Sequence, residues 1–461
     1  MSRSIPTRIG IVLAAGFALA RCQDTQDVTS PRPAALAALS HSSILTGAAG
    51  PFAYVTNSGS NTVSVIATAT NSVVATVPVG TNPDGVAVTP DGGFVYVGNQ
   101  GSGSVSVIAT ATNTVVATIA VGGMPLLVAI TPDGAHVYVA SQVSNTISVI
   151  LTATNTVVAT IPVSSAPTGL AITPDGAHAY VSVPPGAVAV IATATNTVVT
   201  SIPLQEAFGL AVTPDGAFLY AALFCEPPCG AGSVSVVATA TNSVVADIGV
   251  GVEPYRVAIT PDGAFAYVTN IGSSVSVIAT ATHSVVATLP AGIVPLGVGI
   301  TPDGAFVYVA DAFSNAVAVI SNATRTVVAS VAVGSAPRGV ALIPAAAITP
   351  LAIDIKPGDG LNPINSTSNG TIPVALLSSA QLDVLTDADL TALTFGRTGS
   401  ETSLAFCAGS TDVNGDGLPD IVCHFRTRVA GFQAGDTEGI LRGRTHGGAA
   451  LEGRDAVRVI R

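Results

Sequence analysis

The chain has 461 residues, of which only 9% are charged and 48% are hydrophobic, and its formal net charge is −11. This length allows two or three domains. An acidic chain with few Lys and Arg residues is a poor candidate for binding nucleic acid or an anionic membrane surface. No apolar run reaches ~18 residues, so the sequence predicts no transmembrane span.

The first 20 residues have the pattern of a secretory signal peptide. Arg3 and Arg8 supply the positive start, an apolar stretch follows, and Ala18-Leu19-Ala20 is a cleavage motif. We therefore expect export to the periplasm, the cell surface or the medium.

Cys22 follows the expected cleavage site in a partial match to a bacterial lipoprotein box. Arg21 occupies the position where such a box has a small residue. A lipid anchor at Cys22 and a free thiol are therefore both open alternatives. Residues 21–50 are polar and then rich in Ala, and we interpret them as a low-complexity tether.

A Thr-Pro-Asp-Gly motif repeats along most of the chain. Its copies are separated by 42, 42, 40, 47 and 41 residues, and they begin at Thr89, Thr131, Thr173, Thr213, Thr260 and Thr301. A period near 42 is typical of β-propeller blades. Each period contains four short runs rich in Val, Ile, Thr, Tyr and Phe, which are strand-forming residues.

The two ends of the repeat array predict how it closes. Each of the four strand types occurs seven times, but the array begins with a Tyr-bearing strand at Phe52 and ends with an inner-strand sequence, Gly339 to Leu342. A ring closed by three strands from one end and one from the other accounts for both ends and leaves only short sheet edges. The sequence therefore predicts an all-β, seven-bladed propeller over residues 51–344.

Two stretches, Tyr54-Val55-Thr56-Asn57 and Tyr267-Val268-Thr269-Asn270, together with the Pro-Asp-Gly turns, resemble the YVTN family of β-propellers. The resemblance implies a secreted or surface-associated protein of the YncE-like or surface-layer type. It implies no particular ligand.

The loops before the inner strands and after the Tyr-bearing strands should share one rim, which varies most between repeats. We expect this rim to bind ligand. Asp84 and Arg338 should lie on adjacent blades, as either a structural ion pair or a clamp for a ligand. The candidate rim residues are Asp84, Arg338, Tyr255, Arg256, Glu253, Asn57, Asn99, Asn270 and Asp311.

The repeat stops at residue 344 and is followed by a linker at residues 345–350. Strand-like runs then predict a small antiparallel β-sandwich over residues 351–461.

The Asp-x-Asn-Gly-Asp-Gly-x-x-Asp loop of this domain has the oxygen spacing of a Ca²⁺ site, although the bidentate Glu of an EF-hand is missing. The expected ligands are Asp412, Asn414, Asp416, Asp420 and the carbonyl of Leu418. A solvated turn without metal is the alternative. The loop resembles extracellular calcium repeats, and this region resembles a C-terminal module of secreted bacterial proteins.

An oxidising compartment favours two disulfides, Cys225–Cys229 and Cys407–Cys423.

The sequence lacks the motifs of an enzyme active site. No His is placed as a general base and no nucleophile motif occurs. We therefore expect a non-enzymatic propeller that binds a protein, a glycan or a small molecule. A lactonase- or lyase-like enzyme and a purely structural envelope protein are the alternatives.

Overall fold

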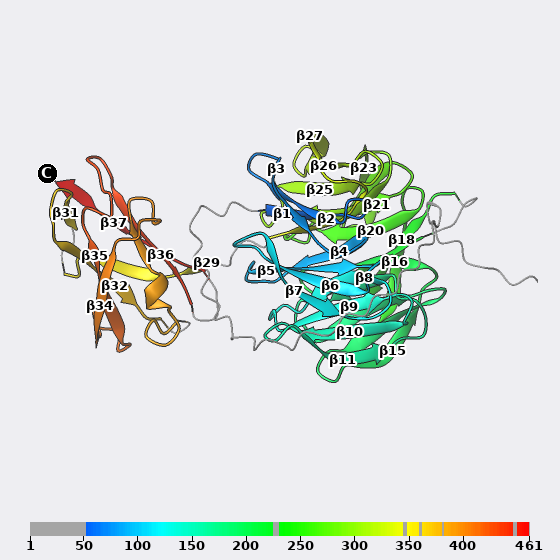
Figure 1. Ribbon diagram of the computed structural model, residues 1–461, viewed down its shortest axis with the longest axis horizontal. Helices are drawn as coiled ribbons and strands as arrows, with labels where there is room; N and C mark the ends of the chain where they lie inside the picture. Colours follow the sequence, from blue (N-terminus) through cyan, green and yellow to red (C-terminus); the bar gives the residue numbers. More distant parts are fainter. Residues whose placement is uncertain are drawn as a thin grey trace, which may run out of the picture. The chain divides into compact units, whose positions relative to one another are not determined.

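The computed structural model describes residues 52–224, 230–343, 348–358, 362–379, 382–445 and 450–460. Seven four-stranded antiparallel sheets form a β-propeller, and two further four-stranded sheets form a second β domain (Figure 1). The expected all-β fold class is confirmed. Within these ranges, no helix is both long and apolar enough to cross a bilayer. The expected signal peptide, tether and Cys22, and the pair Cys225 and Cys229, lie outside the described residues.

Each blade has four strands, which we number from the propeller axis outward. The innermost strands are β28 (Pro337–Leu342), β4 (Pro83–Val88), β8 (Pro125–Ile130), β12 (Gly169–Ile172), β16 (Ala207–Val212), β20 (Pro254–Ile259) and β24 (Pro295–Ile300). The second strands, which carry the Tyr residues, are β1 (Phe52–Asn57), β5 (Phe94–Asn99), β9 (His136–Ser141), β13 (His178–Val183), β17 (Phe218–Leu223), β21 (Phe265–Asn270) and β25 (Phe306–Asp311).

The outer half of each blade is a hairpin. The third strands are β2 (Thr62–Ala67), β6 (Ser104–Ala109), β10 (Thr146–Leu151), β14 (Ala187–Ala192), β18 (Ser233–Ala238), β22 (Ser274–Ala279) and β26 (Ala316–Ser321). The fourth strands are β3 (Ser72–Pro78), β7 (Thr114–Ala120), β11 (Thr156–Pro162), β15 (Thr197–Pro203), β19 (Ser243–Gly249), β23 (Ser284–Pro290) and β27 (Thr326–Ala332).

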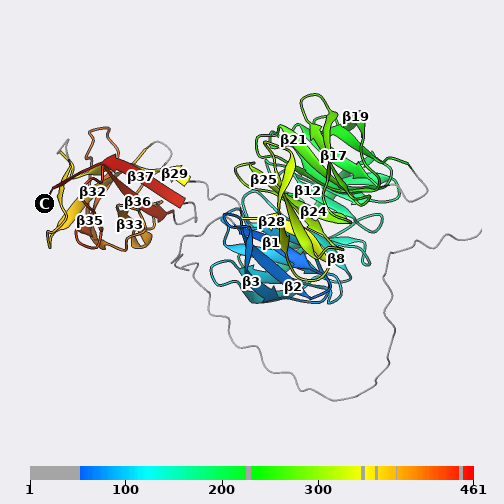
Figure 2. The ribbon, with the colours of Figure 1, turned by 90° about the horizontal axis from the view of Figure 1, so that it is seen from above.

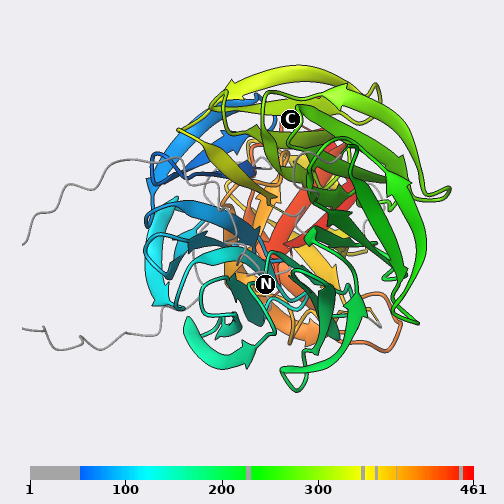
Figure 3. The ribbon, with the colours of Figure 1, turned by 90° about the vertical axis from the view of Figure 1, so that its right-hand side faces the viewer.

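The ring closes as the sequence predicts. Strand β28 pairs antiparallel with β1, with Tyr54 opposite Ala341 and Val55 opposite Val340. Blade 1 is therefore β28-β1-β2-β3, and blades 2 to 7 follow in chain order from β4–β7 to β24–β27. Figure 2 shows β28 beside β1, and Figure 3 shows the blades arranged around a common centre. The innermost strands contact one another in the cyclic order β28, β4, β8, β12, β16, β20 and β24.

The Thr-Pro-Asp-Gly turns are held by their own side chains. In the first copy, the Asp91 carboxylate accepts hydrogen bonds from the Thr89 hydroxyl (2.5 Å) and the Gly93 amide (2.9 Å). Gly92 adopts φ +69°, a left-handed conformation that glycine tolerates best. These turns and the Thr-Asn turns of the hairpins lie on one side of the propeller, which we call the turn rim. The opposite side, where the innermost strands begin, is the entry rim.

A ring of side-chain hydrogen bonds joins each blade to the next at the turn rim. The phenol of each second-strand Tyr contacts a hairpin-turn side chain of the following blade, at 2.5 to 3.2 Å. The pairs are Tyr54–Asn113, Tyr96–Asn155, Tyr138–Asn196, Tyr180–Asn242, Tyr220–His283, Tyr267–Asn322 and Tyr308–Asn71. The last pair crosses the closure between blades 7 and 1.

Hydrophobic packing between blades explains why the strands are apolar on both faces. The second and third strands are almost completely buried, and their Val, Ile and Ala side chains form clusters shared by adjacent sheets. For example, Tyr138 and Ile147 of blade 3 pack with Val181 of blade 4. Burial of a Val or Ile side chain contributes roughly 1.5 to 3 kcal/mol, so this repeated packing provides most of the propeller's stability.

The C-terminal domain is a sandwich with one apolar core. Its first sheet has the order β30-β32-β35-β34 and its second β29-β37-β36-β33, and the core includes Val374, Phe425, Phe395 and Leu441. The strands are β29 (Ile348–Pro350), β30 (Ala352–Ile355), β31 (Pro363–Asn365), β32 (Thr371–Leu377), β33 (Thr394–Gly396), β34 (Leu404–Thr411), β35 (Asp420–Arg426), β36 (Glu438–Arg444), β37 (Ala450–Ala456) and β38 (Arg458–Ile460). The domain is not wholly antiparallel, because β29 with β37 and β31 with β38 form short parallel pairs.

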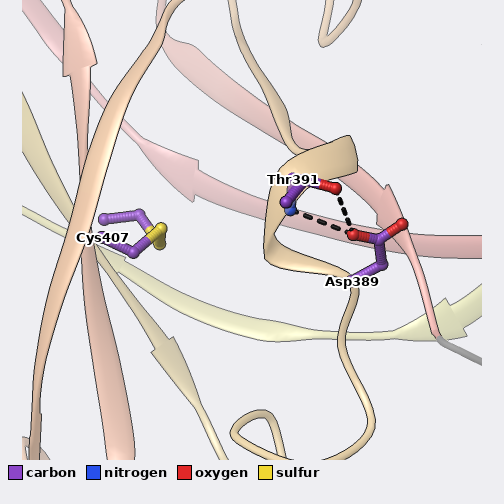
Figure 4. Close-up of a disulfide and its surroundings, with 4 residues drawn as sticks. Asp389, Thr391 and Cys407 are labelled. Atoms are coloured by element: carbon purple, nitrogen blue, oxygen red, sulfur yellow. Dashed lines mark hydrogen bonds between the residues drawn. A yellow bond between two sulfur atoms is a disulfide. The ribbon is translucent and has the colours of Figure 1, made fainter.

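A disulfide and a short helix stabilise this domain (Figure 4). The expected bridge between Cys407 and Cys423 is present, and the two residues lie directly opposite each other in β34 and β35. The 3-10 helix η1 (Leu390–Ala392) is capped by the Asp389 carboxylate, which accepts hydrogen bonds from the Thr391 amide (3.1 Å) and hydroxyl (2.6 Å).

Candidate ligand-binding site

Charged side chains from three blades meet at the entry rim. The second residue of each innermost strand stands at the strand's start, and in blades 1 and 2 this residue is Arg338 and Asp84. The expected ion pair is present, with 3.1 Å between Arg338 Nη1 and Asp84 Oδ2. Arg338 Nε also donates to the Ser58 hydroxyl at 3.1 Å. Gln100 donates to the same Asp84 oxygen at 3.0 Å, and Asp84 is buried.

Arg256 reaches this pair from the far side of the ring. It lies on β20 in blade 6, whose innermost strand does not neighbour that of blade 2. Its Nη1 donates to the Thr168 carbonyl of blade 4 at 3.0 Å, and its Nη2 lies 3.9 Å from Asp84 Oδ1. The guanidinium therefore spans the propeller axis. We call Asp84, Tyr255, Arg256 and Arg338 the axial cluster.

The axial cluster carries more positive than negative charge. Residues 51–344 contain twelve Asp and Glu but only three basic residues, Arg256, Arg325 and Arg338. Two of these three converge on the single carboxylate of Asp84. Arg256 Nη2 is buried without a hydrogen-bond partner in the described part of the chain. A buried donor without a hydrogen-bond partner costs roughly 1 to 3 kcal/mol, and the long contact of Arg256 Nη2 to Asp84 offsets only part of that cost.

Burial and the close spacing of these charges shift the pKa values of Tyr255 and Arg338. Burial raises the pKa of the Tyr255 phenol, Arg256 and Arg338 oppose the shift, and the Asp84 carboxylate adds to it. Burial alone would lower the pKa of Arg338, but Asp84 and Tyr255 together outweigh burial and the pKa is raised. The Arg338 guanidinium is therefore cationic and the Tyr255 phenol is neutral near pH 7.

Aromatic rings border the cluster on one side. The Arg256 guanidinium stacks over the Tyr255 ring at 4.6 Å from its centroid. The Phe208 ring centroid is 5.9 Å from that of Tyr255 and 4.9 Å from that of Phe224. Phe208 and Tyr255 are both half-buried and hold equivalent positions at the starts of β16 and β20. The entry rim thus has a cationic part beside an apolar, aromatic part.

Four other expected rim residues do not belong to this surface. Asn57, Asn99, Asn270 and Asp311 are buried, and their side chains are hydrogen-bonded within their own blades. The three Asn amides donate to Ser or Thr hydroxyls of the third strand in their own blades. Asp311 accepts hydrogen bonds from the amides of Ile293 and Val294. A strand-end side chain that turns toward its own blade cannot also face the axis.

Glu253 is also separate from the cluster. It is half-buried in the turn before β20, where its backbone adopts φ +53°, and among the described residues its carboxylate makes no ion pair. The cluster's acidic partner is Asp84 alone.

The described His residues of the propeller lie at the opposite rim. His136 and His178 begin second strands where other blades have Phe, and His283 replaces a turn Asn in the bond to Tyr220 (2.8 Å). His178 also borders a cavity of about 260 Å³, lined by Thr173, Pro174, Asp175, His178, Tyr180, Asp215, Gly216, Thr239 and Ala240. This cavity is at the turn rim, so it is not part of the axial cluster.

The expected calcium loop is exposed and internally ordered. Asp412 accepts hydrogen bonds from the amides of Gly415 (2.7 Å) and Gly417 (2.9 Å), and Asp416 accepts from the Leu418 amide at 2.8 Å. Asp420, which the sequence also offers as a calcium ligand, is buried, and both of its oxygens instead accept from backbone amides, those of Val413 and Ser378, at 2.8 Å.

The loop therefore fits calcium in part. Asp412, Asn414 and Asp416 present oxygen atoms of the hard type that Ca²⁺ prefers. In the described ranges, however, no three Asp, Glu, His or Cys side chains are grouped as metal ligands.

Comparisons with known proteins agree with the propeller. The family model described as "Lactonase, 7-bladed beta-propeller" matches residues 14–118. No curated protein matches the chain. The fold and the axial cluster define the class as a seven-bladed β-propeller with a charged group at its axis.

Solved structures show the same architecture. Hydrazine synthase of Kuenenia stuttgartiensis is 28% identical, with 59% of this chain and 92% of that chain covered and a TM-score of 0.55. A functionally unknown protein from Desulfotomaculum acetoxidans is 19% identical (64% and 99% covered, TM-score 0.57). A putative 6-phosphogluconolactonase from Bacteroides uniformis is 17% identical (64% and 99% covered, TM-score 0.54). The last two likenesses concern the fold alone.

Proposed function

We propose that this chain is an exported propeller of the YVTN type that binds a ligand at its entry rim and does not convert it. The axial cluster carries the proposal, because two of the propeller's three basic residues meet there and leave one guanidinium nitrogen without a hydrogen-bond partner. Charge placed in this way is more useful for binding than for stability, since a buried ion pair rarely stabilises a fold better than apolar packing does.

The contacts of Asp84 favour binding over catalysis. A general base needs an oxygen that can reach substrate, but Asp84 is buried and already accepts hydrogen bonds from Arg338 and Gln100. The described His residues of the propeller lie at the turn rim, away from this carboxylate. A small molecule, a glycan or a protein segment could occupy the entry rim.

A thermal-shift screen of small molecules tests the proposal. We expect at least one compound to raise the melting temperature of the wild-type chain, and Arg338→Gln to abolish that shift. Arg325→Gln is the matched control, because it removes the third basic residue of the propeller at a distant position, where Arg325 stacks on Phe265. Stabilising compounds whose effect is indifferent to Arg338→Gln would contradict binding at this site. If no compound stabilises the chain, the purely structural alternative gains support.

Lactone hydrolysis is the second candidate. It is favoured by the lactonase family model that matches residues 14–118. A pH-stat assay with glucono-δ-lactone and 6-phosphogluconolactone decides between the two. We expect acid release at the spontaneous rate. Faster release by the wild type, lost in Asp84→Asn, would replace the binding proposal with an enzymatic one.

We also propose that the loop of residues 412–420 binds Ca²⁺ through Asp412, Asn414, Asp416 and the Leu418 carbonyl, with Asp420 holding the loop in place. Calorimetry of the full chain with Ca²⁺ or with a chelator tests this. The C-terminal transition should move to lower temperature on chelation. In Asp412→Asn/Asp416→Asn the chelator should have no effect, and an unchanged wild-type transition would exclude a bound ion.

Export completes the proposal, and a lipid anchor at Cys22 and a free thiol are its two alternatives. Fractionation of the producing cell should place the protein outside the cytoplasm. The mass of the mature N-terminus distinguishes a lipid-modified Cys22 from a chain that begins at Arg21.

A further inference from the structure

The charge balance at the axis indicates what kind of ligand the entry rim accepts. Arg256 and Arg338 together carry two positive charges, and Asp84 carries one negative charge. A ligand with a single negative charge would neutralise the cluster. A dianion would leave an unpaired negative charge in a largely desolvated place, which is costly.

The geometry of the donors favours a planar anion. Arg338 is held by Asp84 and Ser58, whereas Arg256 has one strong hydrogen bond, to Thr168, and a long contact to Asp84. Its Nη2 is buried without a hydrogen-bond partner in the described ranges, as is Nε of Arg325. Guanidinium groups bind carboxylates through two parallel N–H···O bonds, and this geometry adds directional specificity.

The aromatic side of the rim indicates the rest of the ligand. Phe208, Phe224 and Tyr255 are linked by ring contacts of 4.9 and 5.9 Å, and Tyr255 is the ring on which Arg256 stacks. A flat apolar group attached to the anion would therefore lie against aromatic rings. Such contacts add burial and ring stacking to the ion pair.

We propose that the entry rim binds a small organic monocarboxylate with a flat apolar body. The carboxylate lies beside that of Asp84, against Arg256 and Arg338, and the body packs on Phe208 and Tyr255. This inference rests on the proposed binding function and deepens it by naming the chemical class of the ligand.

Titration calorimetry with four probes tests the charge and the shape separately. Benzoate has both features, benzamide lacks the charge, acetate lacks the ring, and phenyl phosphate at pH 8 is a dianion. We expect benzoate to bind at least ~10-fold more tightly than each of the other three, as expected for one charge-assisted hydrogen bond. Equal or tighter binding of benzamide or phenyl phosphate would overturn the assignment.

Variants locate the probe. Arg256→Gln should weaken benzoate binding about 10-fold or more, and Arg256→Lys should do so less, because it keeps the charge but loses the planar fork. Phe208→Leu should weaken benzoate and leave acetate unchanged. Arg325→Gln should stay within about twofold of wild type, and each variant should keep the tyrosine near-UV spectrum of the folded propeller. A loss caused equally by Arg325→Gln would contradict binding at the axis.

The two proposals can fail separately. If benzoate does not bind but another compound loses its thermal shift in Arg338→Gln, the ligand class is wrong and the binding function stands. If no compound shows that behaviour, both proposals fail.

Discussion

Replacing Gly339 by alanine should break the closure of the propeller. Gly339 lies on β28, the strand that completes blade 1. A Cβ at this position would lie 2.3 Å from the Asp84 carbonyl oxygen on the neighbouring innermost strand and 3.0 Å from the Thr56 hydroxyl. Because the nearest atom belongs to the backbone, the added methyl group can be accommodated only if β28 and β4 move apart.

The expected cost follows from the contacts that this movement would break. The Thr56 hydroxyl accepts from the Gly339 amide and donates to the Asp84 carbonyl, both at 2.7 Å. Loss of the two hydrogen bonds costs about 1 kcal/mol each. Overpacking of a tight site adds about 1 to 3 kcal/mol. Gly339→Ala should therefore reduce the free energy of unfolding by roughly 3 to 5 kcal/mol.

Tyrosine fluorescence during urea unfolding measures this effect in the propeller alone. The chain has no Trp, and all eight Tyr residues lie between Tyr54 and Tyr308. Gly249→Ala is the matched control, since a Cβ there has no neighbour within 4 Å and φ is not positive. We expect the control to be neutral or to stabilise by up to about 1 kcal/mol. If Gly339→Ala were as well tolerated as Gly249→Ala, the close approach of β28 and β4 would be wrong.

Three further predictions concern the Tyr side chains that join blades at the turn rim and the C-terminal sandwich. Tyr308→Phe should cost about 1 kcal/mol in urea unfolding. Asn71→Ala should reduce the free energy of unfolding by more, because Asn71 has φ +50° and alanine is disfavoured in that conformation. Glycine tolerates this φ, so Asn71→Gly should lose only as much as Tyr308→Phe. Equal losses of unfolding free energy in all three variants would contradict this argument about the backbone. Burial, aided by Asp215 and Asp303 respectively, raises the pKa of Tyr220 and of Tyr308 to about 12. The folded chain favours the neutral phenols of Tyr220 and Tyr308. Their contribution to the free energy of unfolding is therefore fully present below pH 10 and should be lost between about pH 10 and 12. Tyrosinate absorbance and melting temperature against pH check this, and full titration of the folded chain near pH 10 would exclude it. The double variant Cys407→Ala/Cys423→Ala removes a bridge with a separation of 16 residues and should destabilise the C-terminal domain by about 3 kcal/mol. Calorimetry should show only the C-terminal transition moving, and a shifted propeller transition would refute the assignment.

The repeat made much of the architecture predictable. Its period, its strand types and the missing inner strand at Phe52 together implied seven blades and a closure by Gly339 to Leu342, which the pairing of β28 with β1 confirms. The same register placed Asp84 and Arg338 on adjacent blades, and their ion pair is present. Periodicity is informative here because every copy of the repeat forms the same four strands and packs against neighbouring copies in the same way.

Other features could not be predicted from periodicity. Strand β34 has a weak strand pattern because its sequence, LAFCAGST, is rich in small residues, although Cys407 within it was expected to pair with Cys423. Asn57, Asn99, Asn270 and Asp311 were placed on the rim because they end the second strands, but they turn toward their own blades. The direction of a strand-end side chain depends on neighbours from other parts of the chain.

Arg256 best illustrates the difference between what the sequence determines and what only the tertiary structure decides. The sequence alone determined the number of blades, the order of their strands and the rim on which each loop lies, because these follow from local hydrophobic patterns and turns. Only the tertiary structure decided that Arg256 crosses the axis to Thr168 and Asp84, since that contact depends on the width of the ring and on the length of one side chain.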